Sequence, residues 1–417
     1  MKTIIVIALV AILGWQGKAQ TYDTNGAVVQ TFAGSGFSGY VDGTGQLTMF
    51  NNPRTIVADS FGNLYVEDAG NGVIRKIAPD ATVTTFAGGG NAWAGFGTNA
   101  NLGGLYDSWM AIDHSNALWY AYANGGVFLM RVGSDGYASR RGTNLTGMTV
   151  SPKCGICFDS ANNLYYSGNN KIYRLFTNGT LEVFVGSGNG GWSDGNGIFT
   201  SFSSPSALAC DSADNIYVWD TYNYVIRRIN QNRDVVTIAG QIGTWGNSDG
   251  LGTNAIFSPY NSSPVSAITV DNLGNLYLAC GTSVRKIDAR TNAVTVAGNF
   301  SQTGYANGAG NVAQFNPASG ICVSGGTIFV ADTTNQRIRS ITNNPTAQVI
   351  SPTNLKLGTY PGLQITGIVG RSYQIQASSD MNSWSLKATI LLTSSPYLWI
   401  DQNSVSGNKF YRALMLP

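Results

Sequence analysis

Histidine and glutamate are scarce in this chain, and their scarcity limits the chemistry it can perform. The 417 residues include one histidine, His114, and the only glutamates are Glu67 and Glu182. A zinc site built on several histidines is therefore excluded. A Ser-His-Asp triad would have to use His114, and the repeats described below place that residue in a surface turn.

Charged residues are also few, at 11% of the chain, with 24 basic and 22 acidic side chains. Removal of the leader described next would take away Lys2 and Lys18 and leave equal numbers of each sign. Nucleic-acid binding usually needs a basic face. We therefore expect no nucleic-acid partner.

The one long hydrophobic run lies at the start of the chain. Lys2 is followed by the apolar run Ile4–Leu13 and by small residues up to Ala19, which is the pattern of a signal peptide cleaved after Ala19. The run is shorter than the roughly 20 residues that span a bilayer. We predict a monomer that is secreted or held at the cell surface, extracellular or periplasmic, without a transmembrane segment in the mature chain.

The five cysteines do not resemble a disulfide framework, which a chain of this length does not need. Cys154 and Cys157 form a C-x-x-C spacing, but no helix follows them and no second pair completes a zinc set. Cys157 and Cys322 fall at matching positions in opposite repeats, too far apart for a disulfide. We expect most of the cysteines to be buried thiols.

A segment of about 50 residues recurs along the chain. In the first copy, Pro53–Asp59, Leu64–Asp68, Val73–Ile77 and Val83–Gly88 are short runs rich in β-branched and aromatic residues, separated by turn residues. Later copies begin near residues 104, 148, 202, 257 and 315, and the one near 104 is the most divergent. Four strands per repeat are typical of a propeller blade. The sequence predicts an all-β, six-bladed β-propeller, with seven blades as the alternative.

The two ends of the array are complementary. The sixth copy has only three strands, at Ser319–Val323, Thr327–Ala331 and Arg337–Ile341, and lacks the outer strand that ends other copies. That strand is found alone at Ala27–Gly34. We predict that it completes the sixth blade as its outermost strand, which would close the ring and remove exposed edges.

The repeats resemble the NHL-repeat family over residues 27–343. The resemblance rests on Pro53, Asp59, Gly62–Val66, Asp68, Asn71 and Ile74–Ile77 in the first copy. A linking motif, Gly39–Gly45, supports it and recurs at Gly191–Gly197, Gly246–Gly252 and Gly304–Gly310. The resemblance implies a propeller that mostly serves as a binding platform, since only some relatives are enzymes.

Three blades carry an acid followed seven residues later by an arginine. These residues are Asp68 and Arg75, Asp220 and Arg227, and Asp332 and Arg339. We expect a structural role for them, with each acid bonding its turn or pairing with the arginine. Cys280 replaces the acid in the fifth copy, and the second and third copies have no clear counterpart, so an equivalent ionic contact is not expected there.

The links should lie around the channel mouth, which is the usual ligand face of a propeller. The candidate ligand-binding residues are Tyr40, Asp42, Trp192, Asp194, Trp245, Asp249, Tyr305 and Asn307. Aromatic rings at these positions can stack on sugars or grip a peptide. The alternative is that the rings wedge adjacent blades and the acids form turns. One carboxylate per loop is too few for calcium, and the sequence assigns no catalytic residue, metal or cofactor.

The tail differs from the repeats. Leu363–Val369, Tyr373–Ala377 and Lys409–Ala413 alternate like strands with one buried face, and the tail resembles small C-terminal β-sandwich modules of exported bacterial proteins. We predict a signal peptide at 1–19, a propeller at 20–343, a linker at 344–352 and a sandwich-like domain at 353–417.

Three functions are compatible with this sequence. The leading hypothesis is an exported, non-catalytic scaffold that binds a protein or carbohydrate on its link-loop face. The second is a hydrolase or lyase, similar to gluconolactonases or the peptide-amidating lyase, with a metal at the channel mouth. The third is a purely structural envelope module anchored by the tail.

Overall fold

The chain divides into two compact units in this computed structural model. One unit is Ala19–Gln348 and the other includes Val349–Pro417, so the division falls inside the predicted linker. The structure describes residues 26–90, 94–100, 102, 109–123, 127–141, 155–244, 246–257, 267–343, 362–365, 372–378, 383–391, 397–400 and 410–415.

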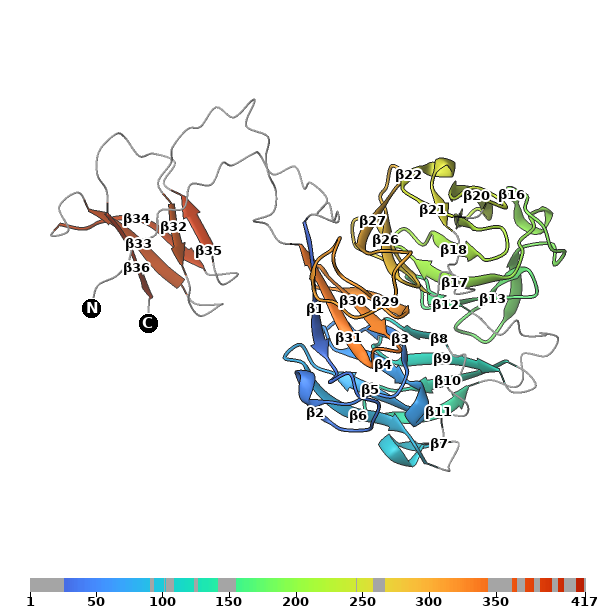
Figure 1. Cartoon of the computed structure of the whole chain (residues 1–417), viewed down its shortest axis with the longest axis horizontal. Helices are drawn as coiled ribbons and strands as arrows, with labels where there is room; N and C mark the ends of the chain where they lie inside the picture. The colour runs from blue at the N-terminus through green and yellow to red at the C-terminus, as the bar shows by residue number, and fades with distance from the viewer. Residues whose placement is uncertain are drawn as a thin grey trace. The chain divides into compact units, whose positions relative to one another are not determined.

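Six sheets of four or five antiparallel strands make up the described part of the larger unit, together with one two-stranded sheet (Figure 1). Each large sheet corresponds to one sequence repeat, and its innermost strand lines a shared central channel. We therefore call the sheets blades one to six. This is the propeller architecture that the sequence predicts.

The strands of each blade run from the inner edge outward in chain order. Blade one has β3 (Pro53–Ala58), β4 (Leu64–Asp68), β5 (Val73–Ile77) and β6 (Thr82–Gly88). Blade two has β8 (Trp109–Ile112), β9 (Leu118–Ala123), β10 (Val127–Val132) and β11 (Tyr137–Arg141). Blade three has β12 (Ile156–Phe158), β13 (Leu164–Gly168), β14 (Lys171–Leu175) and β15 (Leu181–Val185). Blade four has β17 (Pro205–Cys210), β18 (Ile216–Asp220), β19 (Val225–Ile229) and β20 (Asp234–Ala239). Blade five has β24 (Ala267–Val270), β25 (Leu276–Cys280), β26 (Ser283–Ile287) and β27 (Asn292–Gly298).

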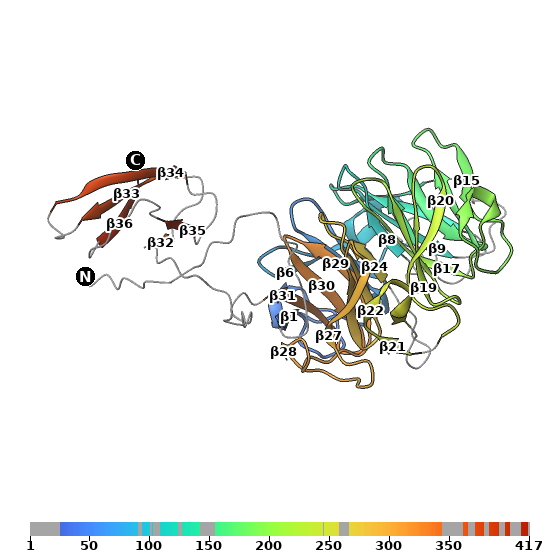
Figure 2. The ribbon, with the colours of Figure 1, turned by 90° about the horizontal axis from the view of Figure 1, so that it is seen from above.

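Blade six combines the two ends of the array. It contains β29 (Ala318–Ser324), β30 (Thr327–Asp332) and β31 (Arg337–Asn343), and its outer strand is β1 (Ala27–Ala33). The pairing is antiparallel, from Ala27 opposite Asn343 to Ala33 opposite Ile338, and this is the pairing that the sequence predicts. Figure 1 shows β1 in dark blue against the orange β31, and Figure 2 shows β31, β30 and β29 in one sheet.

Most blades have a fifth strand that the repeat pattern did not predict. These short link strands are β2 (Gly43–Thr44), β7 (Ala94–Phe96), β16 (Gly195–Asn196), β22 (Gly250–Leu251) and β28 (Gly308–Ala309). Each pairs with the outermost strand of the blade that its link enters. The pairing covers part of an outer edge that would otherwise expose unpaired backbone groups.

Hydrophobic side chains fill the spaces between neighbouring blades. One cluster, for example, joins Ala33 and Ile338 of blade six to Ile56 and Val66 of blade one. Burial of both blade faces explains why every residue of the second strands β4, β13 and β18 is buried. A blade therefore gains its core from its neighbours, as repeat architectures require.

A glycine lies at or directly after the end of the outer strand in five of the described blades. Gly34 has a φ of +100°, and a Cβ there would overlap the carbonyl oxygen of Gln336. The same close approach to the turn between the second and third strands occurs at Gly88, Gly186, Gly240 and Gly298. Only glycine fits both the backbone conformation and the space.

Turns on the face opposite the links connect some of the blades. Asn116 accepts the backbone N–H of Ser60 at 3.0 Å, and Asn162 accepts that of His114 at 2.9 Å. Asp214 accepts the backbone N–H of Ser160 at 2.7 Å. We call these three contacts the turn latches. They join blades one and two, two and three, and three and four.

The described part of the smaller unit consists of two antiparallel sheets. β33 (Ser372–Ser378) lies between β34 (Ser385–Leu391) and β36 (Phe410–Met415), and β32 (Gly362–Ile365) pairs with β35 (Tyr397–Ile400). The predicted strand segments overlap β32, β33 and β36. The sandwich interpretation and the domain boundaries stay predictions.

Candidate functional site

The link acid of blade one contacts a buried arginine. The Arg75 side chain is fully buried and donates hydrogen bonds to Asp68 at 2.9 Å and to Asp42 at 2.6 Å. Its guanidinium also lies over the rings of Phe50 and Tyr40, 5.2 and 5.1 Å from their centroids. We call this arrangement, an arginine between its blade acid and its link acid or amide, a blade lock.

The lock also fixes the link to the outer strand. The second carboxylate oxygen of Asp42 accepts the backbone N–H of Thr85, on β6, at 3.1 Å. Asp194 and Asp249 make the same contact with Thr237 and Thr295, at 2.9 and 3.0 Å. In each of these three link carboxylates, one oxygen thus contacts the arginine and the other accepts a backbone N–H of the outer strand.

Blades four and six repeat the lock. Arg227 contacts Asp220 at 3.0 Å and Asp194 at 2.8 Å. In blade six, Arg339 contacts Asp332 at 2.6 Å and the amide oxygen of Asn307 at 2.8 Å. An amide serves at the link position because its oxygen accepts a hydrogen bond as the carboxylate does.

Blade five keeps half of the lock. Arg285 pairs with the link acid Asp249 at 3.0 Å and contacts the amide oxygen of Asn247. The sequence correctly excluded a blade acid here, because Cys280 takes its place. It did not reveal that Arg285 still gains an ionic partner from the link.

Burial sets the electrostatics of the locks. It raises the pKa of the Asp220 carboxyl to about 6, against the opposing effects of Asn223, Ser203 and Arg227. Burial likewise raises the pKa values of Asp68 and Asp332 above their ordinary range. Each blade acid therefore depends on its hydrogen-bonded arginine to keep its charge in the interior.

The link aromatics remain partly exposed above the locks. Tyr40, Trp192 and Tyr305 are 52%, 59% and 40% exposed. The hydroxyl of Tyr40 bonds Thr85 at 2.8 Å and that of Tyr305 bonds Thr31 at 2.8 Å, so both tyrosines are also anchored to outer strands. Trp245 lies outside the described residues.

Blade four presents a second exposed aromatic beside Trp192. Tyr222 is 69% exposed in the turn between β18 and β19. The next residue, Asn223, donates to the carbonyl oxygen of Gly191 at 2.9 Å, which holds this turn against the link that carries Trp192. We call Trp192 and Tyr222 the aromatic pair. The sequence analysis missed Tyr222 because the equivalent residues are Gly70 and Thr334.

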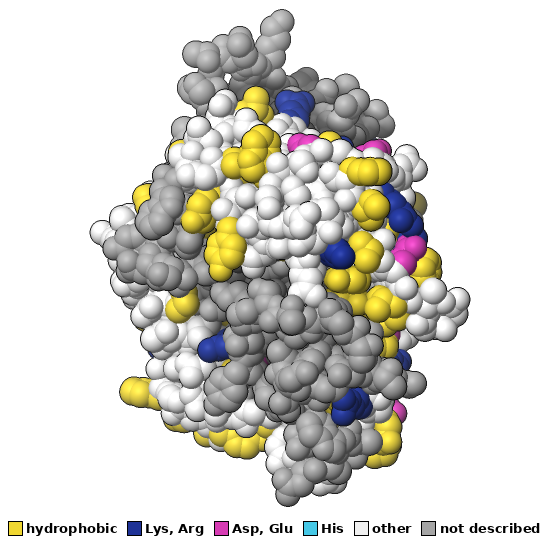
Figure 3. Space-filling model, turned by 90° about the vertical axis from the view of Figure 1, so that its right-hand side faces the viewer, with side chains coloured by type: hydrophobic (Ala, Val, Ile, Leu, Met, Phe, Trp, Pro, Cys, Tyr) yellow, Lys and Arg dark blue, Asp and Glu magenta, His cyan; other side chains and the backbone are white. Residues whose placement is uncertain are grey.

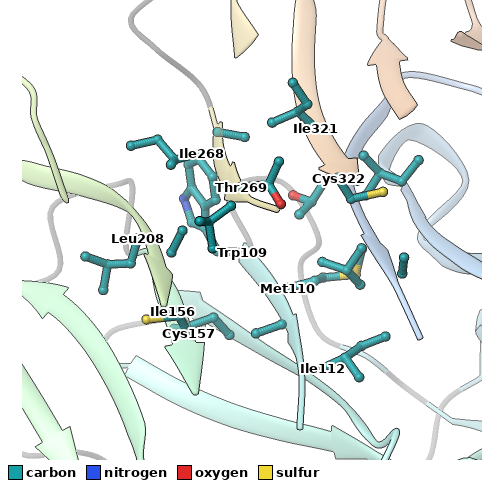
Figure 4. Close-up of a pocket in the computed structure, with 18 of the residues that line it drawn as sticks. Trp109, Met110, Ile112, Ile156, Cys157, Leu208, Ile268, Thr269, Ile321 and Cys322 are labelled. Atoms are coloured by element: carbon teal, nitrogen blue, oxygen red, sulfur yellow. The ribbon is translucent and has the colours of Figure 1, made fainter. Parts of the chain in front are cut away.

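The residues that line the central channel have mostly hydrophobic side chains. A cavity of about 310 Å³ is lined by the innermost strands of all six blades, and Figure 4 shows Trp109 within it, near Ile268. Trp109 packs against clusters from blades two and three, four and five, and five and six. It therefore reaches across the channel and narrows it.

No Asp, Glu or His is among the described residues that line this cavity. Glu67, in the adjoining second strand, is buried and accepts a hydrogen bond from Thr55 Oγ1 at 2.9 Å. The cavity wall offers hydrophobic contact and the hydroxyls of Thr55 and Thr269. The described lining also includes the thiols of Cys157, Cys210 and Cys322.

The opposite face carries the turn acids. Asp59 accepts the backbone N–H groups of Phe61 and Asn63, both within 2.9 Å, and Asp113, Asp159, Asp211 and Asp271 act similarly. His114 lies exposed in such a turn, with its Nε2 3.0 Å from the carbonyl oxygen of Asp159. Both observations agree with the sequence-based interpretation.

Within the described ranges, no group of three or more His, Cys, Asp and Glu side chains is placed to hold a metal ion. Over the same residues, no helix is long and apolar enough to cross a bilayer. Figure 3 shows one face of the protein, on which charged side chains are few and hydrophobic ones are scattered among polar groups.

Comparison with known proteins supports the repeat assignment. No protein-family profile matches the chain. The chloroplastic protein SUPPRESSOR OF QUENCHING 1 of Arabidopsis thaliana is 25% identical over 331 residues, 74% of this chain. NHL repeat-containing protein 2 of Bos taurus is 25% identical over 198 residues, 42% of this chain. The expected resemblance to NHL-repeat proteins is thus confirmed, although each match spans only 27% of the relative.

Solved structures share the fold. A Bacteroides thetaiotaomicron protein of unknown function aligns with a TM-score of 0.59 and 20% identity, and the alignment covers 76% of each chain. An auxiliary nutrient binding protein from the same species aligns with a TM-score of 0.55 and 17% identity, again over 76% of each chain. At these identities the likeness establishes a common β-propeller fold.

Proposed function

We propose that the chain is an exported, non-catalytic propeller that binds a carbohydrate or protein ligand on its link-loop face. The aromatic pair of blade four carries this proposal. Two large rings, 59% and 69% exposed, lie on loops that a hydrogen bond holds together. Exposed rings on a rigid support are suited to stacking on a sugar or anchoring a peptide.

The locks support a revised role for the candidate residues. The carboxylates of Asp42, Asp194 and Asp249 and the amide of Asn307 accept hydrogen bonds from arginines. They would therefore hold the links in place while the aromatic side chains of the face contact the ligand. A rigid site lowers the entropic cost of binding.

The described lining of the channel, which includes no Asp, Glu or His, favours binding over catalysis. An enzyme acting at the channel mouth would need groups that move protons or polarise a substrate. The described link acids are instead divided among separate blades, each with its own arginine. No described contact brings them to one point.

Export rests on the pattern at the start of the chain. The pattern of Lys2, Ile4–Leu13 and Ala19 is that of a cleaved leader. The fold shared with an auxiliary nutrient binding protein supports a binding role for this propeller.

A glycan and peptide array tests the proposal. The chain from Gln20 onward would be compared with Trp192→Ala and Tyr222→Ala, and with Phe61→Ala as a matched control. Phe61 is 75% exposed in a turn on the opposite face. We expect both blade-four variants to lose at least tenfold in affinity for the array ligand while Phe61→Ala binds normally. Equal binding by all variants would place the ligand elsewhere.

A further inference from the structure

Two cysteines from neighbouring blades line the same side of the channel. Cys157 lies on β12 of blade three and Cys210 ends β17 of blade four. Both contribute to the cavity wall, and Cys210 packs against the hydrophobic cluster that contains Cys157. Cys157 is 7% exposed and Cys210 is half-buried. Figure 4 shows Cys157 beside Leu208 of the neighbouring strand.

The backbones of the two strands touch close to these cysteines. A Cβ on Gly155 would overlap the carbonyl oxygen of Ser206. The Ser167 hydroxyl bridges the same residues, because it accepts the N–H of Gly155 at 3.0 Å and donates to the Ser206 carbonyl at 3.1 Å. Cys157 follows Gly155 by two residues, so its strand is held against β17.

The two thiols belong to one packed region between blades three and four. A hydrogen bond between the thiols of Cys157 and Cys210, together with burial, raises the pKa of Cys157. The other described cysteines, Cys280 and Cys322, have pKa values raised by burial, with no thiol among the causes. A disulfide needs Cα atoms within about 7 Å of each other, and the close approach of Gly155 to Ser206 brings the two strands together next to these cysteines.

We propose that Cys157 and Cys210 form a redox modification site, at which an oxidising disulfide such as oxidised glutathione creates a disulfide between blades three and four. The thiolate of one cysteine attacks the reagent and expels one reduced thiol, which leaves a mixed disulfide. The second cysteine, as its thiolate, then displaces the other thiol. Two protein thiols become one disulfide, and one reagent disulfide becomes two thiols, so protons and electrons balance.

The bond would join two inner strands that no covalent link connects nearby. It would close a long loop containing most of blade three and the link into blade four, and such closures restrict the unfolded chain. The inference is independent of the ligand proposal. It does gain relevance if the protein is exported, because disulfides persist in oxidising compartments.

Thiol counting and peptide mapping test the inference. The folded chain from Gln20 onward would be incubated with oxidised or reduced glutathione. It would then be unfolded and labelled with a maleimide, and its mass would be measured to count the labels. We expect two fewer labels after oxidation, a non-reduced peptide joining Cys157 to Cys210, and a rise in melting temperature that dithiothreitol reverses.

Serine variants locate the bond. Cys157→Ser and Cys210→Ser should abolish the loss of labels, whereas Cys322→Ser, a buried cysteine of blade six, should retain it. A peptide joining Cys154 to Cys157, or an unchanged label count in the wild type, would overturn the inference. Because the wild-type peptide map suffices for this decision, a variant that fails to fold would not obscure the answer.

Discussion

At the scale of single residues, a buried arginine connects the link to the blade in blades one, four, five and six. Arg75 lies between the fully buried Asp68 and the half-exposed Asp42. Arg285 has the half-exposed Asp249 but no blade acid. The two blades therefore provide a natural comparison between a complete and a partial lock.

Replacing these arginines with methionine should have unequal costs. Arg75→Met leaves Asp68 as a buried acid without its cation, and we expect a loss of about 3–5 kcal/mol in the free energy of unfolding. Arg285→Met leaves no buried carboxylate, so the loss in its free energy of unfolding should be about 2 kcal/mol smaller than the loss for Arg75→Met. Urea denaturation of both variants measures the difference. Equal losses would show that the buried acid adds nothing to the lock.

The sequence revealed the locks only in part. Asp68 and Arg75 are seven residues apart on one hairpin, so their proximity follows from the strand pattern. Asp42 is distant in sequence from Arg75, and their contact depends on the path of the link around the outer edge. Since the recurring link motif does not show which way its acid points, the sequence analysis proposed ligand contact for Asp42 and missed its arginine.

At the scale of elements, the turn latches depend on one left-handed residue per turn. Asn116, Asn162 and Asp214 have φ values of 59°, 62° and 60°, a conformation that Asn and Asp tolerate better than most residues. Gly62 and Gly274 occupy the same position in blades one and five, with φ values of 83° and 77°. Without a side chain, these glycines can make no latch.

A latch can be added between blades four and five. Gly274→Asn keeps the left-handed conformation, and no atom lies within 4 Å of a Cβ built there. We expect the new amide to accept the backbone N–H of Ser212 and to raise the free energy of unfolding by about 1 kcal/mol. Gly274→Ala, which has the strain without the latch, should lower it by about 1 kcal/mol. If Gly274→Asn lowers the free energy of unfolding as much as Gly274→Ala does, no latch forms between blades four and five.

The strands were predictable because each repeat alternates apolar runs with turn residues. The fifth strands were not, since a two-residue strand such as Gly43–Thr44 carries no alternation to detect. Tyr222 was missed for a related reason. It occupies an exposed turn position at which the residue differs from one repeat to the next, so no repeated pattern marks it.

At the scale of the whole molecule, the fold is a ring completed by strands from both ends of the array. β1 supplies the outer strand of blade six, and Ala27 and Val29 are fully buried in a cluster with Ile341 and Val296. The sequence predicted this arrangement because the sixth repeat lacks its outer strand and a matching strand stands alone at the N-terminus. The identity of the ligand cannot be predicted in this way, because exposed rings can stack on many partners.

Ring closure is the claim on which the locks and the binding face both depend, and removal of β1 tests it most directly. Thermal unfolding would be compared for chains that begin at Gln20, at Gly26 and at Gly34, with a peptide of residues 26–34 added to the shortest. We expect the first two chains to melt alike, and the third to melt at a much lower temperature that the peptide partly restores. If the chain from Gly34 melts at the same temperature as the chain from Gln20, β1 does not close the ring.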